Sequence, residues 1–302
     1  MSTSPTIDNR DLLATCWTWA GDAAPARGDE RSPEDIHARI AAAAAAGWNG
    51  VGLIHADVVA LRDSMGLPAL RKLLDEAGIE KVELEFISNW WTSGAEREAS
   101  DQVRADLFDA APLLGVRTIK VGAQLTAFGS TEPVDGDLFA ESFDALASEA
   151  GRHGLRVAVE PMPMSNLKTV VDGVELVTAV DNPHGGLVVD TWHVRRGGTP
   201  NEALPDVLPI ERVFVAELDD ADEAIVGSLW DDTINHRRNP GEGALDTAGF
   251  IVAMHRAGWA GHWGVEIISH EQRAKPITRA LADTAAATRA AFDAAERRLS
   301  QA

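Results

Sequence analysis

The feature that most constrains the fold is a strand–helix alternation that repeats along the whole chain. Short apolar runs rich in Val, Ile and Leu alternate with longer, Ala-rich amphipathic stretches, and several of these stretches end in Gly just before the next apolar run. This order predicts a parallel sheet covered by helices, and eight repeats favour an α/β fold of the closed (β/α)8 TIM-barrel type. The predicted strands are Leu12–Trp19, Gly50–His55, Lys81–Ser88, Thr118–Gln124, Arg156–Pro161, Gly186–Thr191, Arg212–Leu218 and Trp263–Ile268.

Helix signals and length complete the predicted organisation. One helix is expected to begin at Ser32 as N-cap, with Pro33 in its first turn and Gly47 after its last. A long final helix is expected over Glu271–Leu299. A barrel needs ~250 residues, so the 302 residues predict a single domain over 1–302, with a flexible N-terminus (1–10) and C-terminal tail (297–302). No G-x-G-x-x-G loop follows the first predicted strand, which disfavours a dinucleotide-binding sheet.

Charge and composition exclude several classes of partner. The formal net charge of −20 argues against nucleic acid, whose backbone is bound by clustered Lys and Arg. No apolar run approaches the ~18 residues of a membrane span, and the N-terminus lacks the apolar segment of a signal peptide. The single cysteine, Cys16, cannot form an intramolecular disulfide, so we expect a reducing, cytoplasmic setting.

Acidic residues lie at the ends of the last four predicted strands. They are Glu160, Asp190, Glu217 and Glu266. A carboxylate late in a buried strand is costly unless it is compensated, and strand ends meet at the active face of a barrel. A divalent cation would remove that cost, and oxygen ligands suit Mg²⁺ or Mn²⁺. The alternative is that each carboxylate caps the following helix or pairs with a nearby Arg.

Basic residues near these strand ends are candidate substrate ligands. His193 lies three residues after Asp190, where it either contacts a metal or substrate oxygen or lies on the surface. His236 and Arg237 precede a P-G-E-G turn that is followed by Asp246, the expected cap of the next helix. An Arg there could clamp a substrate oxygen or carboxylate, or the pair could be part of a solvated basic run.

Other candidates lie in the first four strands. Lys120 is inside a predicted strand, where a lysine is seldom buried without a partner. It either faces the site as an acid/base group or pairs with Glu83 or Glu85, which share one face of their strand. His55 and Trp17 lie at strand ends, where they would contact substrate or simply cover the barrel.

These motifs resemble the xylose isomerase-like barrels, the sugar phosphate isomerase/epimerase family, which includes ketose epimerases, inosose isomerases and dehydratases, and 3-dehydroshikimate dehydratases. The most specific matches are VAVEP, GLVVDTWH, R-x-x-PGEG and GVEIIS. The resemblance implies one divalent metal ion held by Glu160, Asp190, the strand-seven position and Glu266. It also implies that His193 contacts a substrate oxygen and that Arg237 is the family arginine before Pro-Gly. Barrels of this kind are often dimers or tetramers, so a homo-oligomer is left open.

Two positions depart from the family pattern. Glu217 stands where the family has His or Gln, which favours Mn²⁺ or Mg²⁺ over Co²⁺ or Zn²⁺ if this carboxylate is a ligand. Met162 stands where dehydratase-like members carry a histidine, which disfavours a dehydratase.

The sequence hypothesis is therefore a metal-dependent isomerase or epimerase that acts on a small sugar, ketose or cyclitol by proton abstraction through a metal-stabilised enediolate. The alternatives are a metal-dependent lyase or dehydratase of an inosose, dehydroshikimate or keto-glycoside, and a non-catalytic barrel or partner subunit. The predicted catalytic residues are Glu160, Glu266 and Lys120, and the predicted substrate-binding residues are His193, Arg237, His236, Glu85, His55 and Trp17.

Overall fold

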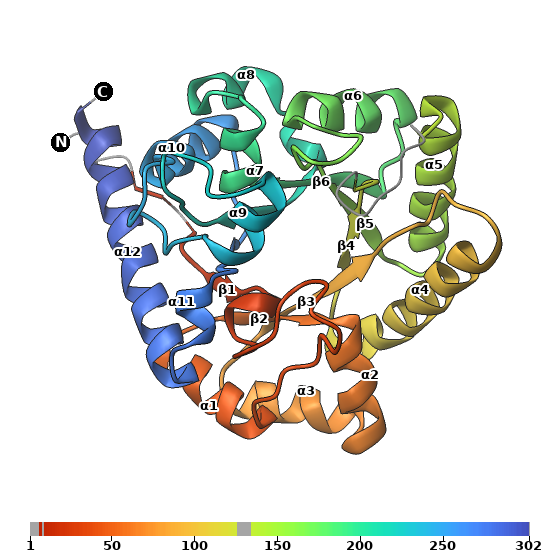
Figure 1. Cartoon of the computed structure of the whole chain (residues 1–302), viewed down its shortest axis with the longest axis horizontal. Coiled ribbons are helices and arrows are strands. Elements are labelled where there is room, and N and C mark those ends of the chain that lie inside the picture. The colour runs from red at the N-terminus through yellow and green to blue at the C-terminus, as the bar shows by residue number, and fades with distance from the viewer. Residues whose placement is uncertain (1–5, 8, 126–133, 302) are drawn as a thin grey trace.

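The computed structural model describes residues 6–7, 9–125 and 134–301 and contains one closed barrel of parallel strands (Figure 1). Each strand pairs with the next in sequence, and the last pairs with the first through Leu12 and Trp263. The predicted (β/α)8 fold is thus confirmed. The strands are β1 Leu12–Ala14, β2 Gly50–Ile54, β3 Lys81–Ile87, β4 Thr118–Gly122, β5 Arg156–Glu160, β6 Gly185–Asp190, β7 Val213–Leu218 and β8 Trp263–Val265.

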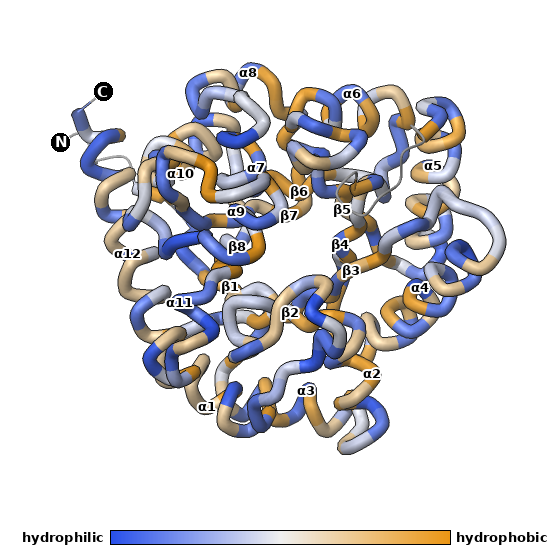
Figure 2. Tube along the Cα trace, in the orientation of Figure 1, coloured by the Kyte–Doolittle hydropathy of each residue, from blue (hydrophilic) through white to orange (hydrophobic). Residues whose placement is uncertain are grey.

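Helices surround the barrel and bury their apolar faces against it (Figures 1 and 2). Among the described residues, no helix combines the length and apolar character needed to cross a membrane. The α-helices are α1 Ile36–Ala46, α2 His55–Ser64, α3 Leu67–Glu76, α4 Gly94–Leu114, α5 Gly136–Arg152, α6 Val170–Val180, α7 Thr191–Arg196, α8 Leu204–Val207, α9 Leu229–Asn235, α10 Thr247–Ala257, α11 His270–Arg273 and α12 Ile277–Gln301. The 3₁₀ helices are η1 Cys16–Thr18, η3 Asn201–Ala203 and η4 Ile210–Arg212.

Strands β1 and β8 are shorter than predicted, and the side chain of Thr18 accounts for the early end of each strand. The chain turns into η1 after Thr15, and the Thr18 hydroxyl donates to the carbonyl of Val265 (2.7 Å). The same hydroxyl accepts the backbone N–H of Ile267 (2.8 Å). These side-chain hydrogen bonds replace the ladder between β1 and β8, while the N–H of Glu266 still donates to the carbonyl of Leu218 on β7 (3.0 Å); Glu266 therefore lies just beyond β8 instead of inside it.

Two predicted helix boundaries were also wrong. Helix α1 begins after Asp35, whose carboxylate accepts the N–H groups of the first turn, whereas the Ser32 hydroxyl donates to the carbonyl of Ala20. The predicted final helix is divided into α11 and α12 around Pro276, which has no N–H to continue a helix.

The start of the described chain is tied to the last helix. Ile7 is buried in the main hydrophobic core, and its N–H donates to Glu296 of α12. Arg10 pairs with Asp293 of the same helix (2.9 Å). The segment that precedes β1 therefore packs against α12.

Candidate active site

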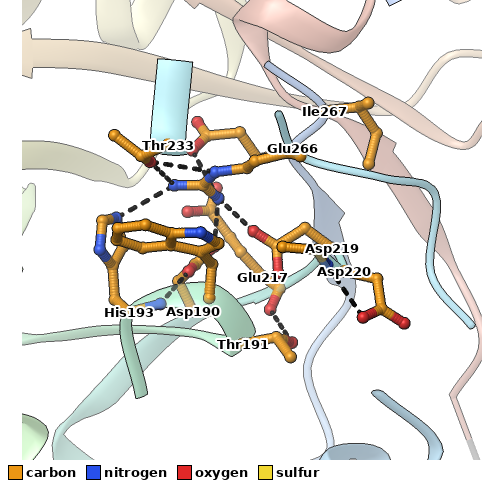
Figure 3. Close-up of polar contacts among 12 residues, drawn as sticks. Asp190, Thr191, His193, Glu217, Asp219, Asp220, Thr233, Glu266 and Ile267 are labelled. Atoms are coloured by element: carbon orange, nitrogen blue, oxygen red, sulfur yellow. Dashed lines mark hydrogen bonds and ion pairs between the residues drawn. The ribbon is translucent and has the colours of Figure 1, made fainter. Parts of the chain in front are cut away.

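Four carboxylates converge at the carboxyl ends of the last four strands. Each of Glu160, Asp190, Glu217 and Glu266 is buried, and one oxygen from each lies within 4.8 Å of the others. Figure 3 shows Asp190, Glu217 and Glu266 gathered in one small region. Parallel strands bring these positions together because Glu160 and Asp190 end their strands, Glu217 is the last residue but one of β7, and Glu266 directly follows β8.

The donor set fits a divalent ion. Oε2 of Glu217 is buried and accepts no hydrogen bond, and Oε1 of Glu160 also lacks one of normal geometry. Buried polar atoms are normally paired, and an unpaired buried carboxylate oxygen carries a large desolvation cost. A cation among these oxygens would meet that need, and an all-oxygen set suits a hard ion.

Arg237 is the central cation of the cluster. Its Nη1 lies 2.9 Å from Oδ2 of Asp190 and 3.2 Å from Oε2 of Glu266, and it also bonds Asp219. Its Nη2 and Nε both donate to the Thr233 hydroxyl of α9, at 2.8 and 3.2 Å. Because every nitrogen of the guanidinium is engaged within the chain, Arg237 orients carboxylates of the site.

The P-G-E-G turn holds Arg237 in place through the neighbouring Asp220. The carboxylate of Asp220 accepts the N–H groups of Gly241 (3.0 Å) and Leu245 (2.8 Å) on either side of the turn. Its backbone exchanges hydrogen bonds with Arg238. Gly243 is required because a Cβ there would collide with the carbonyl of Ala221. Asp219 therefore bonds Arg237 itself, and the adjacent Asp220 bonds the loop that carries Arg237.

Lys120 forms a second ion-pair group inside the barrel. Its Nζ lies 2.7 Å from Oε1 of Glu217 and 2.7 Å from Oε2 of Glu85. Of the two predicted partners on β3, Glu83 instead pairs with His262 (3.0 Å). Burial would lower the pKa of Lys120, but these carboxylates raise it well above its ordinary value. Burial raises the pKa of Glu217 well above its ordinary value although Lys120 opposes the change.

The pKa values of Glu160 and Glu266 shift in opposite directions. Burial, helped by repulsion from Glu160, raises the pKa of Glu266 to about 8, against the attraction of Arg237 and Lys120. Burial also opposes ionisation of Glu160, but the His193 ring beside it, with Nε2 3.4 Å from Oε1, outweighs burial and lowers the pKa. Two neighbouring carboxyl groups with separated pKa values form a typical acid–base pair.

A pocket of about 380 Å³ opens above the cluster. Glu160, His193, Arg237 and Glu266 line it, while Asp190 and Glu217 are not among its lining residues and are almost completely buried. Most of the remaining wall is apolar and comes from the ends of strands and the segments that follow them; it includes Trp17, Ile54, Phe86, Met162, Trp230 and Ile268.

The other predicted site residues are divided between this pocket and places outside it. Trp17, Glu85 and His55 line the pocket, and His55 also bonds Asp106 (2.9 Å). Lys120 does not line it. His236 does not line it either and lies 3.6 Å from Asp231, near the ring of His270.

The sequence missed two polar members of the site. Asp219 is buried against Arg237, and burial followed by repulsion from Asp190 raises its pKa well above the ordinary value. It follows a strand end in the same way as the other carboxylates, which was a usable signal. Thr233 offers no such signal, because it reaches Arg237 only through the placement of α9.

Comparisons with known proteins agree with the fold and family. Residues 40–291 match the family described as xylose isomerase-like TIM barrel. A 3-dehydroshikimate dehydratase of Pseudomonas aeruginosa is 28% identical over 246 residues, which cover 80% of this chain but only 37% of that protein. An inosose isomerase of Bacillus subtilis is 27% identical over 128 residues, 42% of this chain and 45% of that protein. The solved structure of the IolI protein with a bound zinc atom has a TM-score of 0.77 at 17% identity, covering 95% of this chain and 98% of that chain.

Proposed function

We propose, from the premise that this chain belongs to the xylose isomerase-like TIM barrel family, that it is a divalent-metal-dependent isomerase or epimerase of a sugar, ketose or cyclitol. The observation that carries the proposal is the group of four buried carboxylates, two of which also line the pocket. Relatives named as an inosose isomerase and a dehydroshikimate dehydratase support a cyclic hydroxycarbonyl substrate.

The proposed metal ligands are Glu160, Asp190, Glu217 and Glu266. A divalent ion bound there would supply Lewis-acid polarisation of the substrate carbonyl and its neighbouring hydroxyl. Mn²⁺ and Mg²⁺ suit four carboxylates best, while the zinc in the IolI structure keeps Zn²⁺ among the ions to test.

The protein's own groups would then move the proton. Glu160 has a lowered pKa and lines the pocket, so it is suited to remove the proton beside the carbonyl. Glu266 also lines the pocket, and burial raises its pKa in the metal-free chain; in its protonated form it would return a proton to the opposite face or to the neighbouring carbon. The first outcome is epimerisation and the second is isomerisation. His193 would orient a substrate oxygen beside Glu160.

Arg237 and Lys120 receive positioning roles in this scheme. Arg237 lines the pocket but is saturated by Asp190, Asp219, Glu266 and Thr233, so it fixes the cluster rather than the substrate. Lys120 lies outside the pocket lining and fixes Glu217.

A lyase is the second candidate, favoured by the dehydratase relative, which matches 80% of this chain. The same abstraction by Glu160 would be followed by loss of a β-hydroxyl or of an aglycone. Met162 lines the pocket where dehydratase-like members carry histidine, which supports the isomerase over this alternative.

Metal content and solvent-deuterium exchange test the proposal. Protein purified without chelator should contain, or take up, one divalent ion per chain by elemental analysis. With Mn²⁺, Mg²⁺ or Zn²⁺ it should incorporate deuterium beside the carbonyl of at least one member of a panel of ketoses and inososes. Net loss of water or aglycone would assign the lyase instead.

Matched variants localise the activity. Glu160→Gln should reduce exchange by about 10²-fold or more, whereas Glu76→Gln, an exposed position on α3, should leave it unchanged. Absence of any bound divalent ion, or full exchange by Glu160→Gln, would refute the proposed mechanism.

A further inference from the structure

The pocket above the carboxylate cluster has two chemically different parts. Its polar groups include Glu85, Glu160, His193, Arg237 and Glu266. The rest of the lining is largely apolar and is continuous with two separate hydrophobic clusters: one contains Trp17, Ile54 and Ile268, and the other contains Met162. Phe86 packs against both clusters, so it joins the two apolar walls.

The volume of the pocket exceeds what its polar part needs. About 380 Å³ lies within the range of ~300–1,000 Å³ found for sites that enclose drug-sized ligands. Beyond the polar groups, which also include His55, Ser88 and Thr233, the walls made by residues such as Trp17, Phe86 and Met162 offer a polyol ring mostly carbon surface. An apolar substituent on the ring would instead bury carbon against carbon, and aromatic walls favour flat or ring-shaped groups.

The pocket has no spare positive charge for an anionic substrate. Among the described residues that line the pocket, Arg237 is the only Lys or Arg. Its positive charge is shared by Asp190, Asp219 and Glu266. Lys120 beneath it is held by two carboxylates. The segment 126–133, outside the described residues, contains no Lys or Arg. A carboxylate or phosphate held along the apolar walls, away from the proposed metal, would therefore lose its hydration without gaining a cationic side chain.

We infer that the substrate is an uncharged cyclic hydroxyketone that carries a neutral apolar substituent, such as an alkyl or aryl glycoside of a keto-sugar. This inference rests on the proposed function for the polar end of the pocket and adds the chemistry of the remainder. The ketone lies at the carboxylate cluster, and the substituent lies between the walls joined by Phe86.

The test compares four compounds on the metal-loaded protein. They are the methyl, phenyl and hexyl glycosides of 3-keto-glucose, and 3-dehydroshikimate. Deuterium exchange gives kcat/KM, and calorimetry gives Kd. We expect kcat/KM for the phenyl or hexyl glycoside to exceed kcat/KM for the methyl glycoside by about tenfold or more, in line with the free energy gained by burying several carbons. We expect 3-dehydroshikimate to bind more weakly than all three.

Two variants examine the apolar wall directly. Trp17→Leu should lower kcat/KM for the phenyl compound by about tenfold more than for the methyl compound, which removes most of the phenyl preference. Leu125→Lys places a cation on a half-buried lining position and should improve binding of 3-dehydroshikimate by about tenfold. Leu138→Lys, the same change at an exposed position on α5, should not.

The outcomes separate this inference from the proposed function. Exchange with equal kcat/KM for methyl and phenyl compounds, or tightest binding of 3-dehydroshikimate, overturns the substrate class and leaves the isomerase intact. Binding of the phenyl compound without exchange by any ketone supports the substrate class and overturns the proposed function. Neither binding nor exchange for any compound overturns both.

Discussion

The Nζ of Lys120 on β4 lies 2.7 Å from Oε1 of Glu217 on β7, an ion pair that crosses the interior of the barrel. The resemblance to the family pattern predicts a neutral His or Gln at the position of Glu217. Lys120 therefore supplies a positive charge that offsets the negative charge of Glu217, and the two side chains are expected to depend on each other for stability.

Removing Lys120 should expose this coupling. Lys120→Met leaves Glu217 and Glu85 buried without their cation, and loss of one partner of a buried pair costs about 3–5 kcal/mol. In urea unfolding with chelator present, we expect the double variant Lys120→Met/Glu217→Gln to recover a substantial part of that loss. Glu83→Gln is the matched control, because Glu83 pairs with His262 and reaches Lys120 only through longer-range attraction, and adding it to Lys120→Met should bring a much smaller recovery. Equal stability of the two double variants would show that the Lys120–Glu217 contact is not specific.

Metal affinity tests whether Glu217 is a ligand. Its Oε1 bonds Lys120 while its Oε2 has no partner, so one oxygen is free for an ion. We expect Glu217→Gln to weaken Mn²⁺ binding by about tenfold or more in calorimetry, a size typical of perturbed metal sites. Glu85→Gln removes the other carboxylate of Lys120 without touching the four-carboxylate group, so it should leave the Kd within a few-fold. An unchanged Kd in Glu217→Gln would restrict Glu217 to its ion pair.

The stability of the metal-free protein should fall as pH rises from about 5 to 8. The pKa of Glu266 is raised to about 8 in the folded chain, against ~4.3 in an exposed Glu. The folded state therefore holds this proton more tightly, so its stabilisation is complete below pH ~4 and is lost as pH rises through 8. The pKa values of Glu217 and Asp219 are raised as well and act in the same direction.

Thermal unfolding with chelator across this range provides the measurement. Glu266→Gln should have a shallower decline because it cannot lose the proton. Saturating Mn²⁺ should also flatten the decline, because the bound ion favours the ionised carboxylates. The lowered pKa of Glu160 influences stability mainly in acid, so Glu160→Gln should keep most of the decline and lose only the part that comes from its repulsion of Glu266. A metal-free protein whose melting temperature rises over this interval would contradict the assigned shifts.

The barrel and its carboxylate cluster were predictable because both follow from periodicity. Eight alternations set the strands, and the ends of parallel strands meet at one edge, so Glu160, Asp190 and Glu266 had to converge. The early ends of β1 and β8 were not predictable, because they depend on the Thr18 hydroxyl reaching Val265, which is 247 residues away in the chain.

Within the site, the residues whose orientation could not be predicted from the sequence lie on the long connection between β7 and β8. His236 and Arg237 are adjacent and leave the backbone on different sides, and sequence could not tell which of them faces the pocket. The answer depends on Asp220 and the P-G-E-G turn, which fix the loop from outside the site. Thr233 was missed for the same reason, since it acts only through Arg237 once the loop is closed.

Asp220 should consequently matter to activity without touching the pocket. Its carboxylate accepts N–H groups from Ala221, Gly241 and Leu245 and the hydroxyl of Thr247. Asp220→Ala leaves the three N–H groups without this acceptor, at about 1–3 kcal/mol for each that finds no water, whereas the Thr247 hydroxyl keeps the carbonyl of Asp219 (2.7 Å). We expect a loss of roughly 2–4 kcal/mol in the free energy of unfolding and displacement of Arg237 from Asp190 and Glu266.

Exchange kinetics distinguish displacement of Arg237 from simple instability. Well below its melting temperature, Asp220→Ala should have a lower kcat for deuterium exchange and a nearly unchanged KM, because Arg237 orients the carboxylates and not the substrate. Asp220→Asn keeps one acceptor oxygen and should recover part of both stability and kcat. Asp222→Ala, which removes an exposed partner of Arg238, is the control and should alter neither. If Asp220→Ala retained full kcat while losing stability, the turn would support the fold alone and Arg237 would reach the cluster without it.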